Sequence, residues 1–316
     1  MKFRFLHDVP SYPFLAYRRP AMIGSAVILA LALLLVVVKG LNFGIDFRGG
    51  ILIETRSTTA ANLTELRSIL SELDVGEVAL QEFGAETDVL IRIERQQGDE
   101  AEQLVAVEEV KAVLTDVYGD DISFRRVEFV GPKVGEELLI DGLLAVGLAL
   151  GAVLIYIWLR FEWQFGVGAV AALAHDVILT LGLFALTGME FNLSTVAAVL
   201  TIVGYSLNDT VVVFDRVREN LRRYKKKPLT EVLDLSINET LARTLVTGLT
   251  TLLALAALYV VGPAVIGGFT LAMIWGVIVG TYSSIFIAAP VVLMLNPRRE
   301  EAPSGGASET AGEAEG

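Results

Sequence analysis

The run Met22–Val38, MIGSAVILALALLLVVV, contains no charged residue. A helix needs about 20 mostly apolar residues to cross the hydrocarbon core of a bilayer, and this run with its neighbours supplies them. Further stretches of similar character follow along the chain. The six stretches expected to cross a membrane are 21–41, 137–159, 165–188, 192–214, 241–261 and 265–295. The sequence therefore predicts an α-helical membrane protein with six transmembrane helices, five of them within 136–295.

The composition shows that apolar and acidic residues occupy different segments. Of the 316 residues, 53% are hydrophobic and only 20% are charged, against about 25% charged residues in ordinary soluble domains. The formal net charge is nevertheless −12, so the acidic residues must lie outside the apolar stretches. The absence of cysteine from the sequence excludes disulfides, thiolate catalysis and cysteine metal sites. Its two histidines do not supply a multi-histidine metal site.

Basic residues indicate which side of the membrane the chain ends face. Four lie in the N-terminal segment 1–20, seven lie in the loop expected at 216–238, and Arg298 and Arg299 begin the C-terminal tail. With six spans these three segments fall on one side, which the positive-inside rule identifies as the cytoplasm. Both termini are therefore expected in the cytoplasm (N-in, C-in). Because no small-x-small cleavage site follows Val38, the first span is interpreted as a retained anchor.

The segment 42–135 is the large one expected on the outer face. Between positions 46 and 133 it holds 19 acidic and nine basic residues. Strands are expected at 51–55, 77–83, 88–93 and 122–129, with amphipathic helices from Asn62 and over 99–118. This β-α-β-β-α-β order predicts an exoplasmic α+β domain of the ferredoxin-like kind, interpreted as a docking module. The acidic tail 296–316 is expected to be disordered.

Several ionisable residues lie well inside the predicted spans, at a cost of roughly 2.5–3.5 kcal/mol each for an ionised group at the helix centre. Asp209 and Arg243 enter the membrane at similar depth on successive antiparallel spans, so they are expected to pair. One interpretation is a static ion pair that fixes packing. The other is a proton relay, in which breaking the pair loads a proton onto Asp209. Asp176 is interpreted as a second station, and a direct role for the neighbouring His175 stays open.

A polar face is expected to support this relay. Thr201, Tyr205 and Asp209 recur at four-residue spacing on one predicted helix, which places them on one side. The next helix carries a second stripe with helical spacing. It comprises Glu239, Arg243, Thr247 and Thr250. The supporting residues of the relay are therefore predicted to be Tyr205, Asn208, Glu239 and Thr247.

Five stretches together resemble a known family. They are Phe43–Gly50, Val130–Gly135, Ala174–Asp176, Tyr205–Asn220 and Asn238–Thr244. They are similar to the SecD/SecF family of bacterial protein export, and the resemblance covers about residues 15–296. The run YSLNDTVVVFDRVREN at 205–220 is the most specific of them. The short outer segment is similar to that of the SecF branch, because SecD has a much larger outer region.

The resemblance implies an accessory subunit of the Sec translocase in the bacterial cytoplasmic (inner) membrane. In that family SecD and SecF, which resemble RND transporters, are thought to couple proton influx to preprotein export from the SecYEG channel. The family's intramembrane acid and base correspond to Asp209 and Arg243 here. The implied partners are SecD, SecYEG and the translocating preprotein, with protons as coupling ion and no cofactor. Membrane lipids are expected at the basic loop, other accessory subunits stay open, and no nucleic acid is expected.

Two other functions stay open on the sequence. An RND-like proton-coupled small-molecule exporter would need a large outer domain with an apolar pocket, whereas the outer segment here is small and acidic. An assembly scaffold would conduct no ions. An enzyme is not expected, because the sequence has neither a phosphate-binding Gly-Lys-Ser/Thr loop nor a nucleophile–base set.

Overall fold

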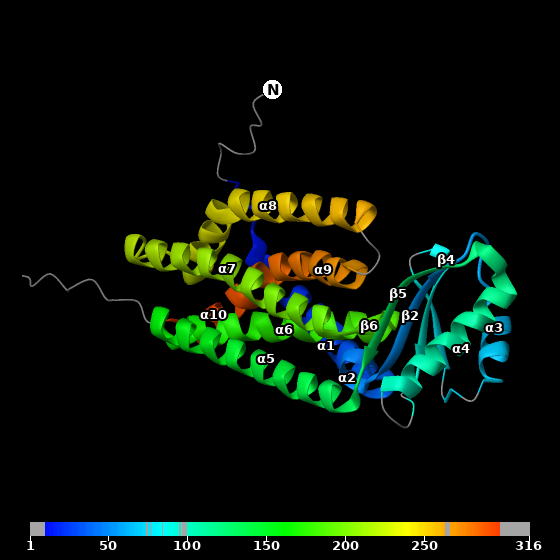
Figure 1. Ribbon diagram of the computed structural model, residues 1–316. Coiled ribbons are helices and arrows are strands. Elements are labelled where there is room, and N and C mark those ends of the chain that lie inside the picture. Colours follow the sequence, from blue (N-terminus) through cyan, green and yellow to red (C-terminus); the bar gives the residue numbers. More distant parts are fainter. Residues whose placement is uncertain are drawn as a thin grey trace, which may run out of the picture.

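The computed structural model describes residues 10–297 except 74, 77, 84, 95, 97–99 and 263–265. Residues 1–9 of the expected N-terminal segment, and the acidic tail from 298 onward, lie outside the described residues. Long helices gather into one bundle, and the strands gather into an α+β domain at one end of that bundle (Figure 1).

In the described part of the chain, six helical spans are long and apolar enough to cross a membrane, which confirms the predicted number. Their helices are α1 (Arg18–Lys39), α5 (Pro132–Arg160), α6 (Trp163–Thr187), α7 (Leu193–Arg223), α8 (Leu229–Val261) and α9 (Gly267–Ser283). The sixth span continues from α9 through a π-helical turn, Ser284–Ala288, into α10 (Ala289–Leu295). The short 3-10 helix η2 (Phe14–Tyr17) leads into α1.

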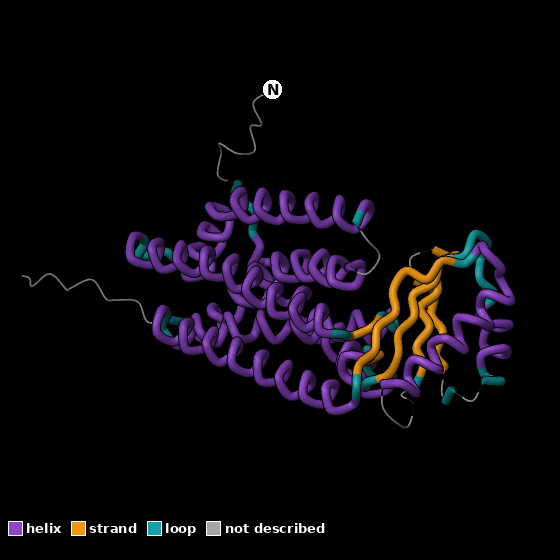
Figure 2. The backbone as a smooth tube through the Cα atoms, in the orientation of Figure 1, coloured by secondary structure: helices purple, strands orange, loops and turns teal. Residues whose placement is uncertain are grey.

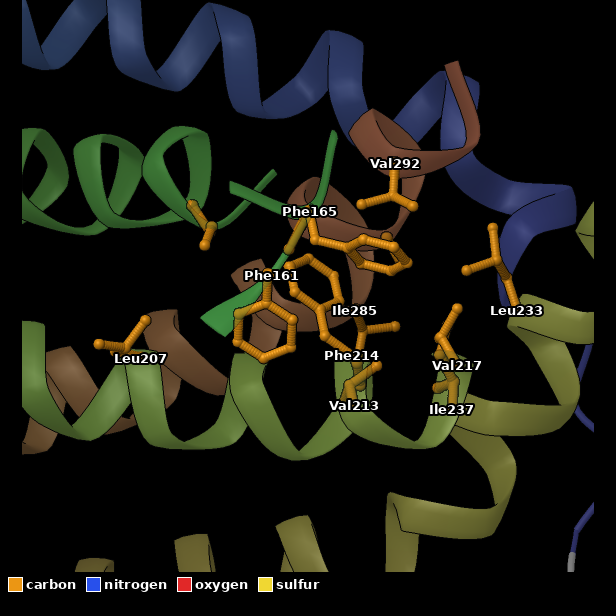
Figure 3. Packing of buried hydrophobic residues seen from close by; sticks show 14 of the residues in the cluster. Phe161, Phe165, Leu207, Val213, Phe214, Val217, Leu233, Ile237, Ile285 and Val292 are labelled. Carbon is orange, nitrogen blue, oxygen red and sulfur yellow. The ribbon is translucent and has the colours of Figure 1, made fainter. Parts of the chain in front are cut away.

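Aromatic and aliphatic side chains from several helices fill the centre of the bundle (Figure 3). The rings of Phe165 on α6 and Phe214 on α7 lie edge to face, with their centroids 5.2 Å apart. Ile285 and Val292, from the last span, belong to the same buried cluster. Because lipid tails are as apolar as these side chains, close packing rather than escape from water holds the helices together.

The outer helices of the bundle leave large apolar side chains uncovered. Val38 on α1 is 76% exposed, Leu159 on α5 is 83% exposed, and Val261 on α8 is 85% exposed. Exposed apolar faces of this kind suit lipid tails or the helices of a membrane partner. The helices α6, α7 and α9 instead bury many of their residues against each other, so the interior of the bundle belongs to them.

The α+β domain follows α1. Its elements are β2 (Gly50–Arg56), α3 (Leu63–Leu70), β3 (Val78–Phe83), β4 (Ala85–Ile93), α4 (Glu100–Tyr118), the 3-10 turn η3 (Gly119–Asp121) and β5 (Ser123–Val130). The strands form one antiparallel sheet in the order β3-β4-β2-β5. The two helices cover the face of the sheet turned away from the bundle (Figure 2). Alternate residues of β2, Ile51 and Ile53, are fully buried beneath them.

Local signals in the sequence account for this packing. Asn62 caps α3, since its side-chain oxygen accepts hydrogen bonds from the backbone N–H groups of Thr64 and Glu65 at 3.2 and 3.3 Å. Leu66 and Leu70 of this helix are buried in the cluster that contains Ile51 and Ile53. The helix predicted to begin after Asn62 therefore begins there.

The prediction of a loop at 216–238 is wrong for most of these residues, which are helical. The helix α7 continues to Arg223 and α8 begins at Leu229, so the non-helical connection is short. The loop was expected because these residues are rich in charge. Their charged side chains instead pair with one another, and Arg216 links α7 to α8 beyond the apolar part of both helices. Its Nε donates to Glu239 of α8 at 2.7 Å, and its Nη1 donates to Glu219 of α7 at 2.5 Å. Arginine and glutamate are also good helix formers.

Three short elements that the sequence did not predict form the joint between the α+β domain and the bundle. The strand β1 (Asn42–Phe43) pairs in parallel with β6 (Glu190–Phe191), and the single-turn helix α2 (Ile45–Arg48) follows β1. Asp46 on α2 accepts a hydrogen bond from the backbone N–H of Leu193 at 2.9 Å. It therefore satisfies a free donor at the start of α7 from a distant part of the chain. Gly49 and Gly50, with φ of 73° and 116°, then turn the chain into β2.

A polar junction ties the sheet to this joint. Arg92 on β4 donates to the side-chain oxygen of Asn42 at 3.1 Å and lies 3.5 Å from the Glu190 carboxylate. The Asn42 amide also donates to the backbone oxygen of Gly188 at 2.9 Å. Beside these groups, a cavity of about 120 Å³ separates part of the sheet from the bundle. Burial raises the pKa of Glu190 above its ordinary value, although the charge of Arg92 opposes this.

The raised pKa of Glu190 predicts that the contacts at the joint are more stable at mildly acidic pH than at neutral pH. When the carboxyl is buried it binds its proton more tightly than when exposed, so the joint loses stability as pH rises through the raised pKa. Glu190→Gln should remove this dependence, whereas Glu82→Gln, an exposed position on β3, should keep it. Spin labels on cysteines introduced at Thr115 and Val260 would report the spread of distances by pulsed electron resonance. An unchanged pH response in Glu190→Gln would contradict the prediction.

Candidate functional site

Asp176 lies on α6 at the centre of the bundle and is fully buried. Two hydroxyl donors and one imidazole ring surround its carboxyl group. Ser206 on α7 and Ser283 on α9 donate to Oδ2 at 2.5 and 2.8 Å. The adjacent His175 ring places Nδ1 2.9 Å from Oδ1. The carboxylate therefore ties three helices together, and its negative charge is met by hydrogen bonds rather than by an arginine or lysine.

His175 is buried beside it and belongs to a second polar chain. Its ring stacks on Tyr282 with centroids 6.0 Å apart, and the Tyr282 hydroxyl lies 2.9 Å from Ser25 Oγ on α1. The other ring nitrogen, Nε2, is buried and has no hydrogen-bond partner among the described residues. A buried ring nitrogen without a partner is unusual in a well-packed interior. His175 therefore adds a second titratable group directly against the Asp176 carboxylate.

Asp209 lies on α7 and is half-buried. Thr244 on α8 donates to Oδ1 at 2.6 Å, and Ser284 donates to Oδ2 at 2.8 Å. Both hydroxyl residues are buried. Asp209 thus joins α7 and α8 to the last span in the way that Asp176 joins α6 and α7 to it.

Adjacent serines connect the two carboxylates. Ser283 ends α9 and binds Asp176, while Ser284 begins the π-helical turn and binds Asp209. Pro290 follows the π-helical turn and has no backbone N–H to donate to the carbonyl oxygen of Phe286. The loss of this α-helical hydrogen bond favours the wider π-helical turn. The junction between α9 and the π-helical turn therefore contacts both acids, the buried Asp176 and the half-buried Asp209. Irregular turns of this kind are frequent at functional sites.

Arg243 does not form the expected ion pair with Asp209 in this arrangement. Its side chain is exposed on α8, and no nitrogen of it lies within 4.0 Å of a carboxylate oxygen of the described residues. It is still close enough for its charge to act on Asp209. The donors Thr244 and Ser284 reach Asp209 instead, because the residue after Arg243 faces the interior while Arg243 itself faces outward.

The predicted supporting residues lie in three different places. Tyr205 is half-buried and close to Gly248, where an added Cβ would lie 3.9 Å from its hydroxyl. Asn208 and Thr247 are exposed, so with Arg243 they make a polar stripe on the outside of the bundle. Glu239 lies apart from this stripe. It accepts hydrogen bonds from Arg216 and from Asn220 at 2.7 and 2.6 Å, and so holds α7 to α8 near the basic end.

Sequence reasoning missed the hydroxyl residues that bind the two acids. They are Ser206, Thr244, Ser283 and Ser284. The available signal was the pair Ser283-Ser284 within the polar run Thr281–Ser284 of a mostly apolar span. Among the described residues, no group of three His, Asp or Glu side chains lies close enough to bind a metal ion. The site offers exchangeable protons on buried carboxyls, an imidazole and hydroxyls, which is the chemistry of proton transfer.

Comparison with known proteins gives consistent matches along the chain. Residues 109–298 match the family described as protein export membrane protein SecD/SecF, C-terminal, and residues 34–61 match the SecD/SecF GG motif. A protein translocase subunit SecF of Rickettsia felis is 45% identical over 298 residues, which is 94% of this chain and 96% of the relative. The corresponding subunit of Rickettsia bellii is 44% identical, with 94% and 98% covered.

Two solved structures are similar over almost the whole chain. One is SecDF, a translocon-associated membrane protein from Thermus thermophilus, with a TM-score of 0.83 and 36% identity. The other is SecDF in a form called super-membrane-facing, with a TM-score of 0.67 and 35% identity. They match 92% and 90% of this chain, which spans only 39% of the length of each of them.

The hydrogen bonds to Asp176 predict a cost for removing one donor. Ser283→Ala should destabilise the bundle by about 1–3 kcal/mol, because a buried charged acceptor loses a partner. Ser194→Ala, at an exposed position near the start of α7, should be close to neutral. Unfolding of the two variants in mixed detergent micelles measures the difference. Equal stability of both would show that Ser283 contributes nothing to holding this carboxylate.

Proposed function

Because the chain belongs to the SecD/SecF family of protein export membrane proteins, we propose that it is a SecF-type subunit that, together with SecD, couples proton influx to preprotein export. The chain is a multi-pass membrane component of the Sec protein-transport pathway. Protons are the coupling ion in this proposal, and no further cofactor takes part. Preprotein leaving the SecYEG channel is the cargo, and the bacterial inner membrane is the location.

The observation that carries the proposal is that two adjacent serines, where α9 passes into the π-helical turn, bind two acids inside the bundle. When Asp209 is ionised, its two oxygens accept hydrogen bonds from Thr244 and Ser284. When it is protonated, one oxygen becomes a donor, and at least one of these bonds must rearrange. Since Ser283 binds Asp176, any shift of Ser284 also disturbs the second acid. Protonation at one acid therefore changes the packing of α9 against α6 and α7.

Arg243 provides the second state of the relay. In the present arrangement its guanidinium is exposed while Asp209 is bound to hydroxyls. A movement of α8 that brings Arg243 into contact with Asp209 would favour the ionised carboxylate and release its proton. A movement back would restore the hydroxyl partners. Each proton that crosses the membrane supplies about 2.3 kcal/mol per 100 mV of membrane potential, so several can drive a large domain movement.

The joint gives this movement a route to the outer domain. The helix α7 carries Asp209, and its first turn is bound by Asp46 at the base of the α+β domain. The two similar SecDF structures have nearly equal identity and coverage but TM-scores of 0.83 and 0.67. That difference supports alternative arrangements of one fold. In this proposal the ferredoxin-like domain at 42–135 is the moving docking module on the outer side.

The polar stripe on the outside of the bundle supports SecD as partner. Arg243, Asn208 and Thr247 are exposed within membrane-spanning helices, where an uncovered charge is costly. The helices of SecD would cover them. The chain spans 39% of the SecDF structures, which supports the same view that it is one part of a larger assembly. Both termini lie in the cytoplasm in this proposal, with the anchor at 21–41 and the remaining spans within 136–295.

The proposal predicts that Asp209→Asn and Arg243→Met each abolish proton flux in vesicles that contain this chain and SecD. Either change removes one of the two alternative states, so preprotein export should lose its dependence on the proton gradient as well. Asp116→Asn, an exposed carboxylate on α4 of the α+β domain, should leave both unchanged. If flux and export persist in both relay variants, the relay is wrong and a scaffold without ion flux is the better account.

A further inference from the structure

The last turns of α5 and α7 lie at the end of the bundle opposite the α+β domain (Figure 1). Residues of these two turns line a charged pocket of about 540 Å³. Its walls carry four arginines and two acids, none of which takes part in the proposed relay. The lining residues are Arg160, Asp215, Arg218, Glu219, Arg222 and Arg223.

The two acids of the pocket are already paired. Asp215 accepts two hydrogen bonds from Arg160 at 2.7 and 2.9 Å, and Glu219 accepts one from Arg216 at 2.5 Å. Arg222 and Arg223 add two further exposed positive charges at the rim. The pocket therefore has a net positive charge, and guanidinium groups are suited to bind phosphate through two parallel hydrogen bonds.

Aromatic residues place this pocket at the level of the lipid headgroups. Trp158 and Trp163 flank Arg160 and are 78% and 59% exposed, as expected for side chains at a membrane interface. The guanidinium groups of Arg160 and Arg218 lie 5.1 and 5.4 Å from the centre of the Phe161 ring. Stacking on this ring fixes two arginines at the boundary between apolar and polar surface.

An uncovered apolar surface leads away from the pocket along α5. Leu148, Ile155 and Leu159 on this helix are 74%, 58% and 83% exposed. A ligand with a phosphate at the arginines and acyl chains along these side chains would match both surfaces. A free phosphate ion would use only the first of them.

We propose that the pocket between the ends of α5 and α7 binds the phosphate of an anionic phospholipid headgroup, with its acyl chains along α5. Basic pockets between membrane helices commonly bind such headgroups. The proposal is independent of the proton relay, because it concerns residues outside that site. A bound lipid would hold the last turn of α7, the helix that also carries Asp209.

The test uses the full chain in mixed vesicles and the fluorescence of its own tryptophans. The chain has three tryptophans, so Trp275→Phe leaves only the two beside the pocket as reporters. Brominated phosphatidylglycerol should quench them more strongly than brominated phosphatidylcholine. Arg222→Gln with Arg223→Gln should lower that preference by about tenfold, since each substitution removes a guanidinium that forms charge-assisted hydrogen bonds with the lipid phosphate.

Two matched variants make the result specific. Lys225→Gln with Lys226→Gln removes the same charge from the connection that follows α7, outside the pocket, and should keep the preference. Arg222→Lys with Arg223→Lys keeps the positive charge but cannot form two parallel hydrogen bonds to phosphate. This variant should lose only part of the preference for phosphatidylglycerol. Circular dichroism of each variant should match the parent. If the variant Arg222→Gln with Arg223→Gln does not fold, the variant Arg222→Lys with Arg223→Lys still decides. An undiminished lipid preference in that variant would contradict the proposal.

Several results would overturn the proposal. Equal quenching by the two lipids would show that no anionic headgroup is selected. An equal loss in the Lys225 and Lys226 variant would show that surface charge alone attracts the lipid. Loss of the preference on adding inorganic phosphate, but not chloride at equal ionic strength, would show a site for free anions instead.

Discussion

A carboxylate inside a membrane protein must find donors within the protein, because lipid offers none. That constraint organises the centre of this bundle. Asp176 and Asp209 draw hydroxyls from α7, α8 and the last span to themselves, and the apolar cluster around Phe165 and Phe214 packs beside them. The acids therefore set which faces of the helices meet, and a change in their protonation alters contacts among several helices together.

Sequence patterns predicted the large features well and the contacts poorly. Six apolar runs indicated six spans because bilayer thickness requires a fixed helix length, and the cost of buried charge indicated Asp176 and Asp209. Partners were harder to predict, because the rotation of each helix about its axis decides whether Arg243 or Thr244 faces Asp209. The π-helical turn that aligns Ser283 and Ser284 depends on contacts among distant helices, so local pattern did not indicate it.

The joint between bundle and α+β domain shows the same limit. Its parts come from positions far apart in the chain, since β1 pairs with β6 and Asp46 binds the first turn of α7. Each part is short, and neither strand has a periodicity that sequence alone would reveal. Gly49 and Gly50, which lie within the matched GG motif, turn the chain into β2 and adopt positive φ there. The helix α7, the joint and the sheet are thus connected by direct contacts.

In the proposed function Asp209 changes its protonation as part of a transport cycle. Infrared difference spectroscopy of vesicles containing this chain and SecD measures that directly, because a protonated carboxyl absorbs separately from a carboxylate. Imposing a proton gradient should produce a carboxyl band that is absent in Asp209→Asn and altered in Ser284→Ala, which removes one of its hydrogen-bond donors. An identical difference spectrum in the parent and in Asp209→Asn would contradict the account.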